Sequence, residues 1–246
     1  MDYELITPLT LTFFLAGTIK GIAGLGLPTV SLGILSLVLD LETAMALLLV
    51  PSFATNLWQA LSGGNIGILL RRLWPFLLPA TVTVWLGAAL FAQLQPHWLE
   101  AMLGILLLLY AIAGLTDLRP PLQNAYERPV GVLCGMVNGT LTGLTGSFVF
   151  PGVMFLHALR LDRHQFVQSM GILFTLSTLA LALALQCHGR LTPSLGLSSA
   201  LGLFPALIGM VIGSHIRHLL TEAQFRRVFF ACVLGLGLAI VNSTIW

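Results

Sequence analysis

The stretch GTIKGIAGLGLP, from Gly17 to Pro28, interrupts the first apolar run of the chain, which covers residues 5 to 39. Glycines recur through it, a lysine lies among them and a proline ends it. A helix that is broken inside a membrane frees backbone N–H and C=O groups, which are tolerated only where they line a cavity or bind something. The stretch therefore predicts a broken membrane helix at a binding site.

A related stretch, GMVNGTLTGLTGSFVFP, covers Gly135 to Pro151. It also has a GxxxG step, further glycines and a final proline, and its first two glycines match Gly17 and Gly21 at an offset of 118 residues. Farther on, LPATVTVWLG recurs as FPALIGMVIG, with its proline and last glycine at an offset of 126. These matches predict two repeats, residues 1–117 and 129–246, joined by a polar linker at 118–128.

The composition excludes a water-soluble globule. Of the 246 residues, 57% are hydrophobic and only 8% charged, and the mean hydropathy is +0.96, so the bilayer must act as the solvent. Continuous apolar runs, long enough for helices that cross the hydrocarbon, predict eight hydrophobic segments and no soluble domain. They cover residues 5–39, 43–62, 73–94, 98–116, 129–159, 165–186, 194–216 and 224–244.

The sequence lacks the residues that several classes of function require. All nine acidic side chains lie at segment ends or in loops, so no carboxylate in the membrane is available as a proton relay. The cysteines Cys134, Cys187 and Cys232 show no metal-ligand spacing, and no catalytic triad, HExxH or phosphate-binding loop is present. We therefore predict no enzyme activity, no metal, no cofactor and no nucleic-acid partner.

The arginines predict the topology, because cytoplasmic loops keep positive charge. If all eight segments cross, the ten arginines divide five to five. If the first segment of each half returns to its own side, nine lie on one side and only Arg190 on the other. The second arrangement predicts an all-α polytopic membrane protein with two inverted-topology repeats, the first segment of each half broken or re-entrant, and both termini on the non-cytoplasmic side. Secondary transporters are built in this way.

The two breaks predict an anion site. Pro28 and Pro151 fit the first position of a resumed helix, where no N–H is needed, and the start of a helix offers free N–H groups and a positive dipole end. The GxxxG steps alternatively serve as helix-packing surfaces. Because breaks occur at equivalent positions in both halves, we favour the site.

Lys20 is the only lysine of the chain and lies inside the first break. An ionisable group at membrane depth is costly, which makes function the default hypothesis. At the offset of 118, its counterpart is Asn138. We expect Lys20 to balance the charge of the anion and Asn138 to add hydrogen bonds. Alternatively, Lys20 extends to the membrane interface beside a shallow hairpin.

Uncharged polar residues form a stripe on the second segment of each half. Ser52, Asn56 and Gln59 share a helical face in the first half. Gln168, Thr175 and Thr178 do the same in the second half. Neutral donors suit a site that binds and releases an oxyanion, and the amides of Asn56 and Gln59 offer two donors each. The alternative is that these groups only hold helices together.

The stretches GTIKGIAGLGLPTVSLGILSL, ETAMALLLVPSFATNLWQALSGG and GMVNGTLTGLTGSFVFPGVMFLHAL resemble the TauE/SafE family of membrane permeases, also called the 4-toluene sulfonate uptake permease family. The resemblance implies an inner-membrane carrier with duplicated halves for sulfite, sulfonates or related organosulfur anions. The predicted substrate-binding residues, from the motifs and the two stripes, are Lys20, Gly21, Gly24, Gly26, Pro28, Asn56, Gln59, Asn138, Gly139, Thr142, Gly143, Gly146, Pro151 and Thr175.

The predicted function is secondary transport of a small anion by alternating access around a midplane site. An anion channel and a non-transport membrane assembly subunit are the alternatives. A carrier exchanges labelled substrate and saturates, whereas a channel passes current. The expected partners are the small anion and the lipid bilayer. The sequence indicates neither the coupling ion, H+ or Na+, nor the oligomeric state.

Overall fold

The computed structural model describes residues 3–116, 122–219 and 221–245. Within these residues the chain is helical and contains no strand, which confirms the predicted all-α fold. Arg119 and positions 118–121 of the predicted linker lie outside the described residues.

Each apolar run yields one helix, except for the first run of each half, which yields two. The helices are α1 (Tyr3–Ala23), α2 (Leu27–Leu35), α3 (Leu41–Leu61), α4 (Ile66–Phe91), α5 (Pro96–Leu115), η1 (Asn124–Tyr126), α6 (Glu127–Thr145), α7 (Gly152–Ala158), α8 (Arg163–Cys187), α9 (Pro193–Ile216), η2 (Arg217–Leu219) and α10 (Glu222–Ile245).

Among the described residues, seven helices are long and apolar enough to cross a membrane: α1, α3, α4, α5, α8, α9 and α10. The chain is therefore a multi-pass membrane protein, but eight hydrophobic spans are not confirmed. Helix α6 is not among the seven. It begins with Glu127 and Arg128 and carries Asn138 and several threonines, which lower its hydropathy.

Glycines with positive φ lie at both breaks. Gly24 has φ of 77° and Gly26 of 104°, between α1 and α2, and Gly146 has φ of 71° where α6 ends. Side chains are rarely tolerated in this left-handed region, so glycine is required there. The chain then resumes as α2 and α7, both of which have a proline at their start.

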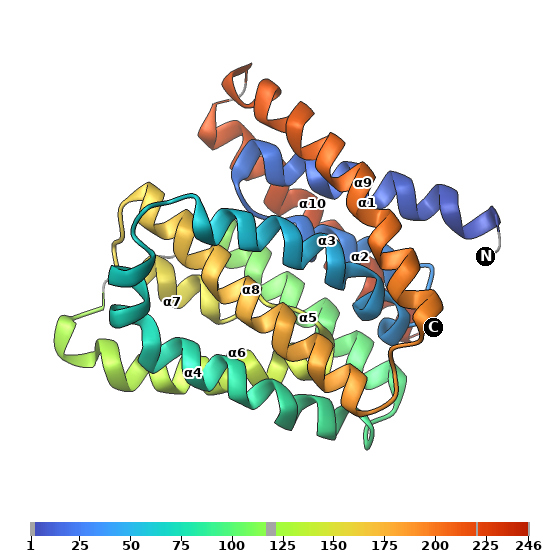
Figure 1. Cartoon of the computed structure of the whole chain (residues 1–246), viewed down its shortest axis with the longest axis horizontal. Coiled ribbons are helices and arrows are strands. Elements are labelled where there is room, and N and C mark those ends of the chain that lie inside the picture. Colours follow the sequence, from blue (N-terminus) through green and yellow to red (C-terminus); the bar gives the residue numbers. More distant parts are fainter. Residues whose placement is uncertain (1–2, 117–121, 220, 246) are drawn as a thin grey trace.

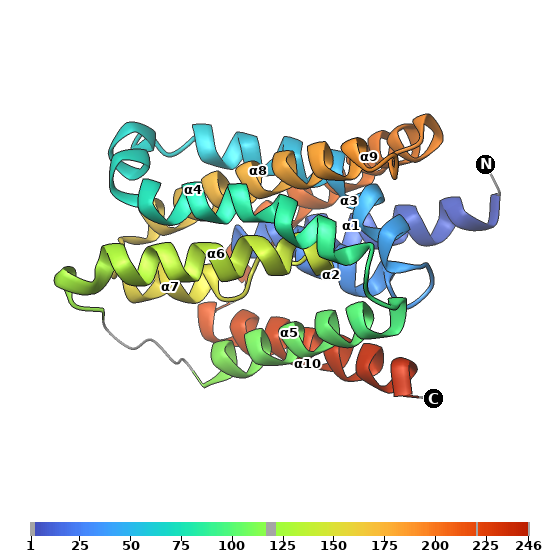
Figure 2. The ribbon, with the colours of Figure 1, turned by 90° about the horizontal axis from the view of Figure 1, so that it is seen from below.

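The two halves interlock. Helix α1 packs along α9, and α6 packs along α4, so the broken segment of each half lies against a long helix of the other half. Helices α3 and α8 pack on each other between the α1–α9 and α4–α6 pairs (Figure 1), and α5 pairs with α10 along one face of the bundle (Figure 2). The apolar windows of α3 and α8 are 61% and 67% buried, against 22% in α10, so these two helices form the core.

Glycines allow the interlocked helices to approach closely. A Cβ atom at Gly21 of α1 would lie 3.0 Å from the carbonyl carbon of Gly213 in α9. On the opposite pair, a Cβ atom at Gly143 of α6 would lie 2.8 Å from the carbonyl carbon of Gly87 in α4. These are the same contact in both halves, because Gly87 and Gly213 are the pair that recurs at an offset of 126.

These contacts correct the register of the repeat. Gly21 corresponds to Gly143, an offset of 122 rather than 118. Other contacts agree: Gly24 faces the side chain of Val167 in α8, and Gly146 faces that of Met45 in α3, so both positions and both partners differ by 122. The counterpart of Lys20 is therefore Thr142 and not Asn138, which lies one helical turn earlier.

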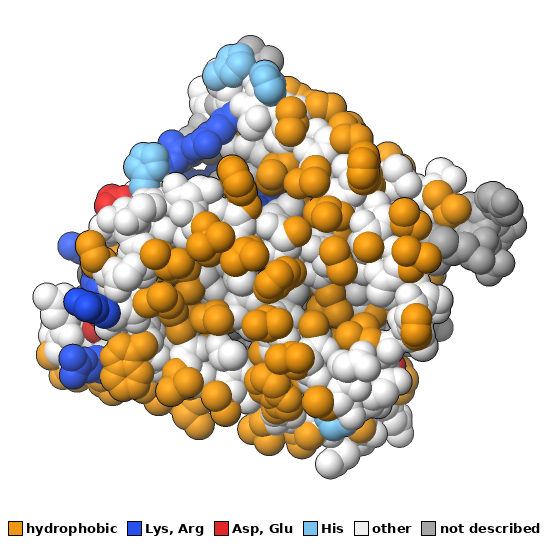
Figure 3. All heavy atoms as spheres, in the orientation of Figure 1, with side chains coloured by type: hydrophobic (Ala, Val, Ile, Leu, Met, Phe, Trp, Pro, Cys, Tyr) orange, Lys and Arg blue, Asp and Glu red, His pale blue; other side chains and the backbone are white. Residues whose placement is uncertain are grey.

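The connections divide between the two ends of the bundle. The α3–α4 and α7–α8 connections lie at the left end of Figures 1 and 2, and the α4–α5 and α8–α9 connections lie at the right end. The start of α1 and the end of α10 share the right end. On the face in Figure 3, Lys and Arg side chains gather along the left and upper edge, and apolar side chains cover the middle.

Candidate functional site

Lys20 lies inside the bundle, in the last turn of α1, and its side chain is 4% exposed. Its Nζ donates hydrogen bonds to Thr55 Oγ1 at 3.2 Å and to Asn56 Oδ1, both on α3. Among the described residues no carboxylate pairs with it. A buried charge without a counter-charge is costly, so this position is suited to an anion. The side chain of Lys20 is thus buried within the bundle and does not lie at its surface.

Two buried donors on α3, the helix that Lys20 contacts, have no acceptor. Because Asn56 Oδ1 accepts from Lys20, the amide Nδ2 of Asn56 is left over, and it has no hydrogen-bond partner. The hydroxyl of Ser52, one turn earlier on α3, also has none. Both side chains are fully buried. Buried polar groups are nearly always paired, so these two groups are candidates for binding a ligand.

The second half offers only neutral groups. The amide Oδ1 of Asn138 accepts from the backbone N–H of Gly152 at 2.9 Å, and its Nδ2 has no partner. The hydroxyl of Ser177, which corresponds to Thr55 at the offset of 122, also has none. Thr142, the counterpart of Lys20, donates instead to Ser147 O at 3.0 Å across the break.

Other predicted polar residues donate hydrogen bonds to backbone carbonyls in the structure. Gln59 Nε2 donates to Val167 O at 2.6 Å, and Gln168 Nε2 donates to Ala60 O at 2.7 Å, so the two amides link α3 and α8 reciprocally. Thr175 donates to a carbonyl of its own helix at 2.6 Å. The donors of Gln59 and Thr175 are thus engaged in structural contacts, and their contact with a substrate stays a prediction.

The predicted glycines and prolines divide into two groups. Gly21, Gly139 and Gly143 face the backbone of a neighbouring helix, which is the packing alternative. The remaining residues form the breaks themselves: Gly24, Gly26 and Pro28 in the first half, and Gly146 and Pro151 in the second.

The sequence pattern did not indicate the contribution of Thr55, which accepts a hydrogen bond from Lys20. This residue lies beside Asn56 but outside the stripe of the second segment, and its role depends on the approach of α1 to α3. Ser177 was missed for the same reason, since only the corrected register relates it to Thr55. Serine and threonine residues often lie beside a polar stripe. A site residue can therefore be identified among them only when the packing of the neighbouring helix is known.

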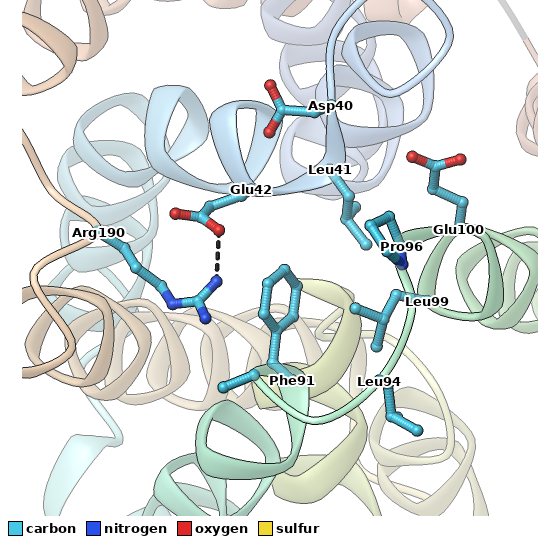
Figure 4. Close-up of a pocket in the computed structure, with 10 residues that line it drawn as sticks. Asp40, Leu41, Glu42, Phe91, Leu94, Pro96, Leu99, Glu100 and Arg190 are labelled. Carbon is cyan, nitrogen blue, oxygen red and sulfur yellow. Dashed lines mark hydrogen bonds and ion pairs between the residues drawn. The ribbon is translucent and has the colours of Figure 1, made fainter.

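A cavity of about 230 Å³ is lined by the start of α3, the α4–α5 connection, the start of α5 and the α8–α9 connection. Asp40, Glu42 and Glu100 contribute carboxylates to it, and Arg190 contributes a guanidinium (Figure 4). Arg190 Nη1 donates to Glu42 Oε2, and its guanidinium lies 4.6 Å from the centre of the Phe91 ring. The ion pair therefore joins the α8–α9 connection to the start of α3, beside the end of α4. Neither Lys20 nor Asn138 lines this cavity.

Comparison with known families gives a match to a family described as "Sulfite exporter TauE/SafE", over residues 9–240. Comparison with curated proteins and with solved structures gave no match. The family match covers both breaks, the core helices and nearly the whole chain, and the family consists of membrane transporters of sulfur anions. This chain therefore belongs to the TauE/SafE family of sulfite exporters.

Proposed function

We propose that this protein is a secondary transporter of sulfite, a sulfonate or a related small organosulfur anion, with Lys20 as the positive charge of its binding site. One observation supports this function above all: Lys20 is buried in the helix bundle and has no carboxylate partner among the described residues. A bound anion supplies the missing counter-charge.

The neutral groups around Lys20 complete the site. Asn56 Nδ2 and Ser52 Oγ have no acceptor, and a sulfur oxyanion offers several acceptor oxygens. Hydrogen bonds to a charged partner are stronger than those between neutral groups. A single lysine with neutral donors also permits release, which a cluster of cations would oppose. We assign direct substrate contact to Lys20, Asn56 and Asn138, and the shaping of the site to the break glycines.

We further propose that the halves are inverted repeats and that access alternates between them. The reciprocal packing of α1 with α9 and of α6 with α4 supports this relation, as do the paired contacts of Gly24 with Val167 and of Gly146 with Met45. In transporters of this plan the site lies where the repeats meet. In this arrangement, the Glu42–Arg190 ion pair holds one end of the transport pathway closed.

The orientation follows from the charges of the connections. Of the ten arginines, only Arg190 lies in a connection at the end of the bundle that the termini share, by the predicted topology. Because cytoplasmic loops are rich in Arg and Lys, we place that end outside and the protein in the cell inner membrane.

The test is transport of labelled sulfite into proteoliposomes by the wild-type protein and by Lys20→Met, with and without an imposed pH gradient. Saturable uptake, accelerated by unlabelled sulfite on the other side, is expected for the wild type and distinguishes a carrier from a channel. Loss of uptake is expected for the variant, provided that it elutes as a folded monodisperse protein. Normal uptake by Lys20→Met would contradict the proposed site.

A further inference from the structure

The residues that the two halves contribute to the proposed site differ in charge. This difference bears on the charge of the substrate. In the first half, Lys20 contributes one positive charge against α3. At the corresponding place in the second half, Thr142 is neutral, fully buried and bonded to Ser147 O. The α8 residues that correspond to Thr55 and Asn56 at the offset of 122, Ser177 and Thr178, are neutral as well.

Among the described residues, Lys20 is the only buried lysine or arginine. It is also the only lysine of the sequence, and the described arginines lie in connections or near helix ends. Asn138 and Ser177, both fully buried, each have an unpaired donor in the second half. These groups suit uncharged or partly charged oxygen atoms. They do not neutralise a second full negative charge, which would remain buried without a partner.

We propose that the site selects singly charged oxyanions over doubly charged ones, with Lys20 neutralising the charge and the neutral donors of the second half, Asn138 and Ser177, binding the remaining oxygens. This inference rests on the proposed function and narrows it: sulfite is carried in its singly protonated form, and sulfonates, which carry one charge each, are substrates of the same kind.

Methanesulfonate and sulfate test this selectivity directly, because both are tetrahedral and similar in size, and a methyl group replaces one oxygen. Each is added as a competitor to the uptake of labelled sulfite by the wild-type protein in proteoliposomes at fixed pH. Methanesulfonate is expected to compete at a concentration at least about a hundredfold lower than sulfate, because an unpaired buried charge carries a large penalty. Equal or better competition by sulfate would overturn the inference and leave the proposed function standing. Absence of transport of any anion would overturn both.

The pH dependence gives a second readout without any substitution. Sulfite passes from its singly to its doubly charged form near neutral pH, whereas methanesulfonate keeps one charge. The uptake of sulfite relative to that of methanesulfonate, at fixed total concentrations, is expected to fall as the pH rises through neutrality. A ratio that stays constant or rises would contradict selection of the singly charged form.

A substitution tests whether the second half sets this limit. Thr142→Lys places a second cation at the counterpart of Lys20 and is expected to improve competition by sulfate relative to methanesulfonate. Thr140→Lys is the matched control, because Thr140 lies two residues away on α6 and is half-buried. If sulfate competes equally better in both variants, the effect comes from any positive charge on α6. That result would overturn the role proposed for Thr142 and the second half of the site. If Thr142→Lys does not fold, the competition in the wild type still decides the question.

Discussion

Lys20 and Asn56 meet between α1 and α3, where Lys20 Nζ donates a hydrogen bond to the amide Oδ1 of Asn56. This contact fixes the orientation of the amide, so that its Nδ2, which has no partner in the structure, is the group that remains for a ligand. One charged and one neutral donor are thus presented together by two different helices. A substrate that binds both would couple the position of the first break to the core helix α3.

Close packing of α1 on α9 predicts that Gly21 cannot carry a side chain. A Cβ atom there would lie 2.8 Å from the backbone nitrogen of Ser214, so Gly21→Ala must separate the helices. We expect a loss of about 1–3 kcal/mol, seen as a lower Tm in detergent. Gly196→Ala on α9 is the control, because its Cβ atom would lie in open space. Equal Tm values for the two variants would contradict the packing.

We expect a substitution in the first break to reduce transport, whereas a substitution that is equally destabilising elsewhere should not. Gly24 has φ of 77° and Gly64, in the α3–α4 connection, has φ of 73°. Alanine at either position is expected to cost about 1–2 kcal/mol, because side chains are disfavoured in this conformation. Only Gly24→Ala should also lose most of its sulfite uptake. Uptake reduced equally in both variants, at equal protein in the vesicles, would argue against a special role for the break.

The Glu42–Arg190 ion pair predicts how one end of the pathway opens. Leu99 lines the neighbouring cavity and is 2% exposed, so Leu99→Cys, in a background without the native cysteines, reports on access. Arg190→Glu or Glu42→Arg alone places like charges together and is expected to accelerate labelling of this cysteine by a maleimide. The double exchange restores an ion pair and should slow the labelling again. Rates that do not respond to either single substitution would show that the pair does not hold this end closed.

The orientation predicts the side from which Cys187 reacts. This exposed cysteine ends α8, at the end of the bundle where α1 starts and α10 ends (Figure 1). A membrane-impermeant maleimide is expected to label it in intact cells, and Cys187→Ser should remove the signal. The variant Ser62→Cys, at an exposed position in the α3–α4 connection, should react only after the cells are permeabilised. The reverse pattern would invert the proposed topology.

The sequence predicted the breaks and Lys20, because these features have local causes. Glycine is the residue for positive φ, as at Gly24 and Gly146, and a lone lysine in an apolar run is unusual wherever it lies. The all-helical membrane fold followed from hydropathy in the same way. The polar character of α6 was underestimated, since its run was counted with that of α7.

The register between the halves was wrong because it depends on contacts. Glycines recur every four residues at 135, 139 and 143, so offsets of 118 and 122 both superpose glycine on glycine. The offsets are distinguished by contacts with other helices, those of Gly21 and Gly143 and those of Gly24 and Gly146. For the same reason, the sequence could not separate glycines that pack helices from those that form the breaks.

The substitution Asn56→Asp tests most directly whether Lys20 is the charge that holds the anion. Aspartate has the shape of asparagine and keeps an acceptor for Lys20 Nζ, but it supplies a permanent counter-charge in place of the substrate. Asn65→Asp, at the start of α4, adds the same charge outside the site as a control. The measurement is exchange of labelled sulfite in proteoliposomes that contain equal amounts of folded protein. We expect exchange to be lost in Asn56→Asp and retained in Asn65→Asp, whereas wild-type exchange in Asn56→Asp would contradict a role for Lys20 in binding the anion.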